Sequence, residues 1–459
     1  ETWEKAGIEN MSQEEGIKYC EALFAPYLDG NELISNASHL RGSAIWIRFP
    51  RVICNNWVHW ADVDNKKVPF VLMGDAAHTA HFSIGSGTKL ALEDAISLAE
   101  HLKNDATLEQ ALEEYSAARS VDVLRIQNAA RNSTEWFENV ARYAHMEPEQ
   151  FTYSMLTRSQ RISHENLRLR DAEGIEQFER WFAQQAGMTL SAEQTPPPPM
   201  FTPYALRDMK LKNRIVFAPT LMYSAENGVV NTFHQNHYSA RALGGAALVM
   251  AEMTAVTPEG RVTPGCAGLW NDEQMTAWRE VVRQVQQNGA CMGIQLGHAG
   301  RRGSTQRGWE NVNKPLQSDN WDLLSASAIA YDQDSATPAA ITREQMDTIR
   351  DAFVAATQRA DQAGFDCIEL QAADGYLVSS VISPLTNQRT DEFGGSLENR
   401  MKFPLEVFTA MRAVWPENKP MFVRISATDW AEGGTTVDEA VDIARLFKAA
   451  GADLIDVSS

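Results

Sequence analysis

CIELQAADGYLVSS, at residues 367–380, is an apolar run that ends in polar side chains and a glycine turn. Five similar apolar runs occur in the same half of the chain, with helical patterns between several of them. They are RIVFAP at 214–219, ALVMAEM at 247–253, CMGIQL at 291–296, MFVRIS at 421–426 and LIDVSS at 454–459. Alternating strands and helices are typical of a parallel sheet, and strands that are apolar throughout indicate a sheet covered on both faces.

The helical patterns between these runs have recognisable ends. Thr342 and Gln345 have the spacing of a capping box, and Gly364 stands where that helix should end. A second helix is expected between Thr436 and Gly451. Such units without a Gly-rich dinucleotide fingerprint favour a (β/α)8 TIM barrel over an open doubly wound sheet. We expect an α/β fold with about six of the eight barrel strands, the last two beyond Ser459, and a site at the carboxyl ends of the strands.

A proline-rich segment, QTPPPPMFTP at 194–203, precedes the barrel. Four consecutive prolines exclude a helix or a central strand and favour a stiff extended spacer. We therefore divide the chain into a first domain at 1–190, a linker at 191–202 and the barrel at 203–459. An ordered surface loop inside one domain is the alternative.

The bulk composition excludes several classes of protein. The 459 residues carry a formal net charge of −19, which repels phosphate backbones and argues against a nucleic-acid partner. The cysteines form no C-x-x-C pair, and Cys291 and Cys367 are expected to be buried free thiols in a reducing compartment. No membrane-spanning run and no signal peptide are visible. We expect a soluble cytoplasmic protein in which Glu1 and Ser459 mark cuts through a longer chain.

GDAAHTAHFSIGSGTKLALEDA, at residues 74–95, carries the first chemical signal. A strand-like pattern at 42–60 and an apolar strand at 68–73 lead to Asp75, a glycine-rich turn and a helix expected from Thr88. The residues expected on one face of that helix are Leu90, Leu92, Ala95, Ile96, Ala99 and Leu102. A carboxylate after a strand can accept hydrogen bonds from ribityl hydroxyls, and a helix N-terminus favours negative charge. A plain glycine-rich turn is the alternative. Residues 107–190 are expected to be mostly helical.

This stretch resembles the second flavin motif of the class A flavoprotein monooxygenases, over roughly residues 1–190. The resemblance implies the C-terminal part of that fold, FAD, and a hydroperoxyflavin that attacks an electron-rich ring. The residues it assigns to FAD are Gly74, Asp75, Gly85, Ser86, Gly87 and Thr88. His81 is assigned to the substrate, although the family usually has two prolines where this chain has His81 and Phe82. His78 and His81 alone do not predict a metal site.

From Met200 onward the chain resembles the Old Yellow Enzyme family. The matching segments are LKNRIVFAPTLMYSAENG at 211–228, EMTAVTPEGR at 252–261, GIQLGHAGR at 293–301, SPLTNQRTDEFGGSLENR at 383–400 and VRISATDW at 423–430. The resemblance implies an FMN-binding barrel that uses NAD(P)H. The residues it places around FMN are Pro219, Thr220, Met253, Gln295 and Arg424.

The same resemblance implies roles for individual side chains. Gln295 pairs with the pyrimidine edge of the flavin, and Arg424 places a cation near N1 and C2, where reduction adds charge. Tyr223 borders the substrate, and Tyr376 donates the proton opposite the hydride. A buried ion pair with a structural role is the alternative for Arg424, and a structural role is also the alternative for Gln295.

One departure from the family concerns its catalytic pair. Relatives have H-x-x-H or H-x-x-N after the fourth strand, which polarises a substrate carbonyl, and this chain has Gln371 and Asp374. The amide of Gln371 can still donate, whereas an ionised Asp374 cannot and repels a developing enolate. Losing one such donor costs roughly 3–4 kcal/mol in the transition state, so weak reduction of ordinary enones is expected unless Asp374 stays protonated.

The order of monooxygenase part, linker and barrel resembles the bifunctional aryl-CoA flavoproteins of the anthraniloyl-CoA monooxygenase and salicylyl-CoA 5-hydroxylase type. This resemblance implies hydroxylation of an aromatic acyl-CoA with O2 and NAD(P)H, reduction of the product ring at FMN, and a homodimer. Two alternatives stay open. One is a hydroxylase whose barrel is a non-reducing scaffold, and the other is an NAD(P)H-dependent ene-reductase.

Overall fold

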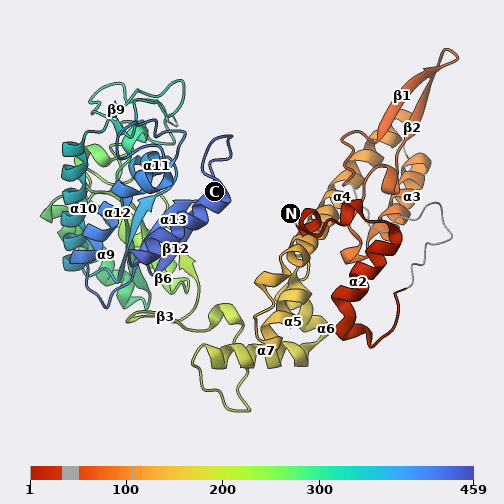
Figure 1. The fold of residues 1–459 in the computed structure, drawn as a ribbon. Helices are drawn as coiled ribbons and strands as arrows, with labels where there is room; N and C mark the ends of the chain where they lie inside the picture. The colour runs from red at the N-terminus through yellow and green to blue at the C-terminus, as the bar shows by residue number, and fades with distance from the viewer. Residues whose placement is uncertain (1, 34–50, 105–106, 312, 459) are drawn as a thin grey trace. The chain divides into compact units, whose positions relative to one another are not determined.

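The computed structural model describes residues 2–33, 51–104, 107–311 and 313–458. The chain forms two compact units, Glu1–Phe178 and Glu179–Ser459, and each is described by itself (Figure 1). The division falls inside a helix, whereas the predicted linker at 191–202 begins after that helix ends.

The second unit is built on a parallel sheet of six strands. In spatial order the strands are β5 (Val216–Phe217), β6 (Leu248–Ala255), β7 (Cys291–Gly297), β10 (Cys367–Ala372), β11 (Met421–Ser426) and β12 (Leu454–Ser458). All six predicted strands are confirmed. Each new strand adds beside the previous one, and the order never reverses as it does at the switch point of a doubly wound sheet. The sheet is therefore a parallel half-barrel.

Helices connect these strands and cover the outer face of the sheet. They are α8 (Thr232–Leu243), α9 (Asp272–Gln287), α10 (Arg343–Ala363), α12 (Leu397–Val414) and α13 (Val437–Ala449). Figure 1 shows α10 and α12 alongside each other on the outside of the sheet, and the two helices are in contact. The predicted capping box of Thr342 with Gln345 is present, and Gly364 ends α10 at φ 94°. Every residue of β6 and β10 is buried, as expected for strands covered on both faces.

Two short strands close the bottom of the half-barrel. β3 (Tyr204–Leu206) and β4 (Met209–Leu211) pair as an antiparallel hairpin. Met209 and Leu211 pack against Leu248 and Phe422, which lie near the amino ends of their strands. The hairpin was not predicted, because its strands are too short for a periodic pattern. The other short elements are β8 (Leu324–Ser325), β9 (Ala339–Ala340) and α11 (Leu377–Ile382).

The first unit is mainly helical. Its helices are α1 (Thr2–Ala6), α2 (Gln13–Leu28), α3 (Gly87–Asn104), α4 (Leu108–Glu138), α5 (Pro148–Thr157) and α6 (His164–Arg170), and α7 (Ala172–Gln185) is the helix inside which the division falls. An antiparallel hairpin, β1 (Val58–Val63) with β2 (Lys66–Val71), projects beyond the helices (Figure 1). The predicted helical content of 107–190 and the strand before Gly74 are confirmed. Part of the strand pattern at 42–60 lies outside the described residues.

The predicted apolar face of α3 is wrong. Leu90 is buried, but Leu92, Ile96 and Leu102 are 62%, 59% and 50% exposed. Residues two apart point to nearly opposite sides of a helix, so Leu90 and Leu92 cannot share a face. The helix instead buries the face that carries Leu90 and Asp94.

Two further expectations can be compared with the structure. All five cysteines are free thiols, with Cys367 buried as predicted and Cys291 only partly buried. Among the helices of the described segments, none combines the length and the apolar character needed to cross a membrane.

Candidate functional site

The carboxyl ends of the barrel strands bring the predicted FMN residues of three different strands together. Strand register places Gln295 of β7 opposite Met253 of β6 on one side and Glu369 of β10 on the other. One step further toward the carboxyl ends, Gln371 of β10 lies opposite Arg424 of β11. The remaining predicted FMN residues, Pro219 and Thr220, follow the end of β5.

A chain of hydrogen bonds links three of the polar side chains in this site. Gln295 Nε2 donates to Glu369 Oε1 over 2.7 Å, and Gln371 Nε2 approaches Gln295 Oε1 at 3.4 Å. The backbone N–H of Ala373 donates to Gln371 Oε1 over 2.9 Å. Because a carboxyl oxygen accepts at one end and a backbone N–H donates at the other, these contacts set the orientation of both amides.

Glu369 is a buried acid that sequence reasoning missed. Its side chain lies inside the barrel with 2% exposure. Burial, together with the nearby charge of Asp456, raises its pKa to about 8, although the hydrogen bond from Gln295 and the charge of Arg424 act in the opposite direction. The signal available in the sequence was an acidic residue inside the apolar run CIELQA, two positions before Gln371.

Arg424 is held at the rim by two carboxylates. Its Nη1 lies 3.0 Å from Asp456 Oδ2, and its Nε lies 3.6 Å from Asp374 Oδ2. Among the described residues, that buried Nε has no hydrogen-bond partner. A partly buried cation with an unused N–H at its buried Nε, next to an oriented amide at Gln295, fits the electron-rich pyrimidine edge of a flavin. The donor set therefore fits FMN.

Asp374 lies in the loop after β10, with its backbone in the left-handed region at φ 61°. Ser458 Oγ donates to its Oδ1 over 2.7 Å, and Gln371 Nε2 donates to its Oδ2 over 3.2 Å. Gln371 is thus already occupied by protein partners. The role of its amide toward a substrate stays a prediction.

Two tyrosines border the same rim. Tyr376 is 7% exposed and shares an apolar cluster with Met253, and Tyr223 packs against that cluster. Burial raises the pKa of both phenols, so both stay protonated at neutral pH. The guanidinium of Arg302 lies 5.0 Å from the centre of the Tyr376 ring, and its Nη1 donates to the backbone oxygen of Asp374 over 2.6 Å. Arg302 was not identified from the sequence.

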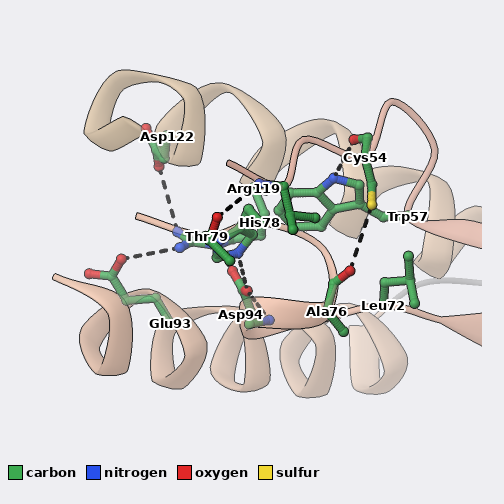
Figure 2. Close-up of polar contacts among 12 residues, drawn as sticks. Cys54, Trp57, Leu72, Ala76, His78, Thr79, Glu93, Asp94, Arg119 and Asp122 are labelled. Atoms are coloured by element: carbon green, nitrogen blue, oxygen red, sulfur yellow. Dashed lines mark hydrogen bonds and ion pairs between the residues drawn. The ribbon is translucent and has the colours of Figure 1, made fainter. Parts of the chain in front are cut away.

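In the first unit, one carboxylate organises the predicted FAD loop (Figure 2). Asp94 Oδ2 accepts from the backbone N–H of Gly74 over 2.9 Å and lies 2.7 Å from His78 Nε2. Its Oδ1 accepts from Arg119 Nε over 2.9 Å. Burial acts to raise the pKa of Asp94, but these hydrogen bonds outweigh it and hold the pKa below its ordinary value. The network attaches the loop that follows β2 to two helices, α3 and α4. It also gives His78 a structural partner.

The other predicted FAD residues lie in the segment between β2 and the first turn of α3. Asp75 is exposed in a short 3-10 turn, and Ser86 is buried just before the helix. Gly85 has φ 63°, which favours glycine, and Gly87 is the first helical residue. A Cβ at either glycine would meet nothing within 4 Å, so the backbone there has open space on that side.

His81 lines a cavity of about 270 Å³ in the first unit. The wall is formed by the segment from Thr79 to Phe82, by one side of α4 and by two arginines, Arg51 and Arg131. His81 stacks on Phe82 with ring centres 4.2 Å apart. Within the described part of the chain, no group of three His, Cys, Asp or Glu residues could hold a metal ion.

Comparison with known proteins identifies relatives of the barrel. Residues 199–459 match the NADH:flavin oxidoreductase / NADH oxidase family. The NADPH dehydrogenase of Bacillus subtilis (strain 168) is 41% identical over 262 residues, which are 57% of this chain and 73% of that protein. The NADPH dehydrogenase of Geobacillus thermodenitrificans (strain NG80-2) is 42% identical over 57% of this chain and 72% of its own length.

Solved structures show the same architecture. A 2-naphthoyl-CoA reductase in complex with 2-naphthoyl-CoA superposes with a TM-score of 0.52 and 25% identity, over 56% of this chain and 40% of that one. Morphinone reductase superposes with a TM-score of 0.50 and 29% identity, over 56% of this chain and 71% of that one. The Old Yellow Enzyme resemblance of the barrel is confirmed. The class A monooxygenase resemblance of the first unit stays a prediction.

Proposed function

The chain belongs to the NADH:flavin oxidoreductase / NADH oxidase family, and we propose that its barrel reduces an activated C=C bond with a hydride from NAD(P)H. The observation that carries this proposal is the rim itself. An oriented amide at Gln295, a partly buried cation at Arg424 and a protonated phenol at Tyr376 come together at the carboxyl ends of the strands. This combination suits a flavin, because it meets the electron-rich edge with positive charge and offers a proton donor near the ring.

FMN would supply hydride transfer from the nicotinamide to the substrate. Gln295 would hold its pyrimidine edge, and the orientation of Gln295 is set by Glu369. Arg424 would stabilise the negative charge that reduction adds, since a fixed cation at this edge needs no rearrangement during the reaction. Tyr376 supplies the proton to the carbon opposite the hydride, and its raised pKa keeps the phenol protonated until that step.

The test is an anaerobic two-step experiment on the full-length protein loaded with FMN. NADPH or NADH should bleach the flavin absorbance, and an activated alkene should restore it with formation of the saturated product. Flavin that is reduced but not reoxidised by any of a panel of enones, quinones and nitroalkenes would favour the scaffold alternative. Flavin that NAD(P)H does not reduce would contradict the proposal.

A second function is proposed for the first unit. We infer that it is the C-terminal part of an FAD monooxygenase that hydroxylates an aromatic acyl-CoA, such as anthraniloyl-CoA or salicylyl-CoA. Two observations support it: the loop anchored by Asp94 at the predicted FAD residues, and the cavity beside His81 with two arginines. The barrel also resembles part of a 2-naphthoyl-CoA reductase whose structure is a complex with an aryl-CoA thioester.

Oxygen uptake separates the two activities. The full-length protein, with both flavins and NAD(P)H, should consume O2 and hydroxylate anthraniloyl-CoA or salicylyl-CoA. Hydroxylation followed by loss of ring unsaturation supports the bifunctional enzyme. If the protein reduces alkenes but consumes no O2 with any aryl-CoA, the monooxygenase proposal is refuted and only the ene-reductase activity remains.

A further inference from the structure

The amide of Gln371 has no hydrogen left for a ligand. One N–H of Nε2 is directed to Asp374 Oδ2 at 3.2 Å, and the other approaches Gln295 Oε1 at 3.4 Å. The amide oxygen is occupied as well, because it accepts from the backbone N–H of Ala373 over 2.9 Å. An amide carries two N–H groups, so all of them are in use within the protein.

The carboxylate of Asp374, in contrast, has acceptor capacity that is not used. Its Oδ1 accepts from Ser458, and its Oδ2 accepts from Gln371 and lies 3.6 Å from Arg424 Nε. A carboxylate offers about four acceptor positions, so at least one is left. The side chain is 32% exposed, which leaves that position open to a ligand.

Asp374 also contacts residues of the proposed FMN site and of its border. Its carboxylate is next to Arg424, which lies at the proposed flavin edge, and its backbone oxygen accepts from Arg302, which stacks over Tyr376. The carboxylate of Asp374 thus offers a substrate a hydrogen-bond acceptor. Polarising a substrate carbonyl would instead require a hydrogen-bond donor at this position.

We propose that Asp374 determines substrate specificity by accepting a hydrogen bond from a ring hydroxyl or ring amine. This inference rests on the proposed FMN site and narrows its substrate class. The barrel then selects ligands that carry an O–H or N–H on the ring over simple ketones and ethers of the same shape. Hydrogen bonds to a charged group are stronger than neutral ones, so the selection should amount to about tenfold in affinity.

Phenol and anisole test this directly, because they share a ring and an oxygen and differ in the O–H donor. Binding to the full-length, oxidised, FMN-loaded protein is followed by calorimetry and by the change in flavin absorbance, without NAD(P)H and therefore without turnover. The native protein should bind phenol about tenfold more tightly than anisole. Asp374→Gly, which suits the left-handed backbone, should abolish the difference by lowering the affinity for phenol and not that for anisole.

Two further variants keep the result interpretable. Asp374→Asn retains a neutral acceptor and the same backbone preference, so an intermediate ratio is expected. Asp319→Gly is the matched control, because Asp319 is an exposed aspartate of the same barrel with a similar φ of 56°. Its phenol to anisole ratio should equal that of the native protein.

The outcomes are distinct. Equal affinity of the native, FMN-loaded protein for phenol and anisole would overturn this inference and leave the proposed reductase intact. Equal weakening of both ligands in Asp374→Gly would reduce Asp374 to a structural role. A full-length protein that binds no FMN, which its visible absorbance shows before any titration, would refute the proposed function together with this inference.

Discussion

Gln295 and Glu369 lie opposite each other on neighbouring strands of the barrel, and Gln295 Nε2 donates to Glu369 Oε1 over 2.7 Å. Both residues are buried, each with 2% exposure. The amide can therefore turn only one face toward the flavin. The carboxyl group of Glu369 therefore sets the orientation of the residue that is proposed to hold the cofactor.

Compared with the native protein, the Glu369→Gln variant should gain in relative stability as the pH rises. The pKa of Glu369 is raised from 4.5 to about 8 by burial, so the native state holds its proton over a range in which the unfolded chain has lost it. The stability contributed by this group is complete below pH 4.5 and is lost as the pH rises toward about 8. The native protein should lose roughly 1.4 kcal/mol relative to the variant for each unit of pKa shift.

Calorimetric unfolding of the native protein and the variant between pH 4.5 and 9 measures this difference. As the pH rises to about 8, the unfolding temperature of the native protein should fall relative to that of Glu369→Gln. Above about pH 8 the difference should stay constant. A gap that does not change with pH would show that Glu369 is not protonated in the native state.

Tyr376→Phe should slow one half-reaction and spare the other. The phenol is the proposed proton donor, and loss of a general acid typically costs about 100-fold or more. Rapid mixing should show flavin reduction by NAD(P)H at close to the native rate and slow reoxidation by the alkene substrate. Equal loss in both half-reactions would refute the role of proton donor.

Arg424→Gln should weaken FMN binding and lower the reduction potential of the flavin. The substitution removes the cation that faces the proposed pyrimidine edge and leaves Asp456 and Asp374 without their common partner. Fluorescence titration of the apoprotein gives the affinity, and a dye-coupled titration gives the potential. Arg445→Gln is the control, since that side chain is 73% exposed and, within the described ranges, pairs only with the neighbouring Asp442. An unchanged potential in Arg424→Gln would remove Arg424 from the flavin edge.

Asp94→Asn should destabilise the first unit by about 3–5 kcal/mol, because it leaves the buried guanidinium of Arg119 without a full counter-charge. Asp122→Asn removes an exposed partner of the same guanidinium, at 3.8 Å, and should cost less than about 1 kcal/mol. Chemical unfolding of the two variants compares them directly. Similar costs for both substitutions would contradict the anchoring role of Asp94.

The contribution of Asp94 should also depend on pH in the acid range. Its pKa lies below the ordinary value of 3.8, so its stabilisation is present above that pH and is lost as the pH falls through the native pKa. The difference between native protein and Asp94→Asn should therefore shrink below about pH 4. A difference that persists at pH 2 would show that the charge of Asp94 is not what anchors the loop.

Local patterns predicted much of the fold. The six apolar runs, the capping box of Thr342 with Gln345 and the left-handed Gly364 are confirmed, because each depends on residues close together in the chain. The face of α3 was predicted wrongly, because Leu90 and Leu92 point to nearly opposite sides of the helix and packing against α4 buries the side with Leu90 and Asp94.

The sequence by itself determined the order of strands and helices, the barrel class and the residue types at the rim. Only the tertiary structure decided how those residues are used. The contacts of Gln295 with Glu369 and of Asp374 with Ser458 join positions 74 and 84 residues apart. Such pairs depend on the register between parallel strands, and short-range periodicity contains no information about register. The sequence therefore showed only that Asp374 stands where relatives have a hydrogen-bond donor. The tertiary structure showed that both amide hydrogens of Gln371 have protein partners, whereas the carboxylate of Asp374 has an acceptor position left.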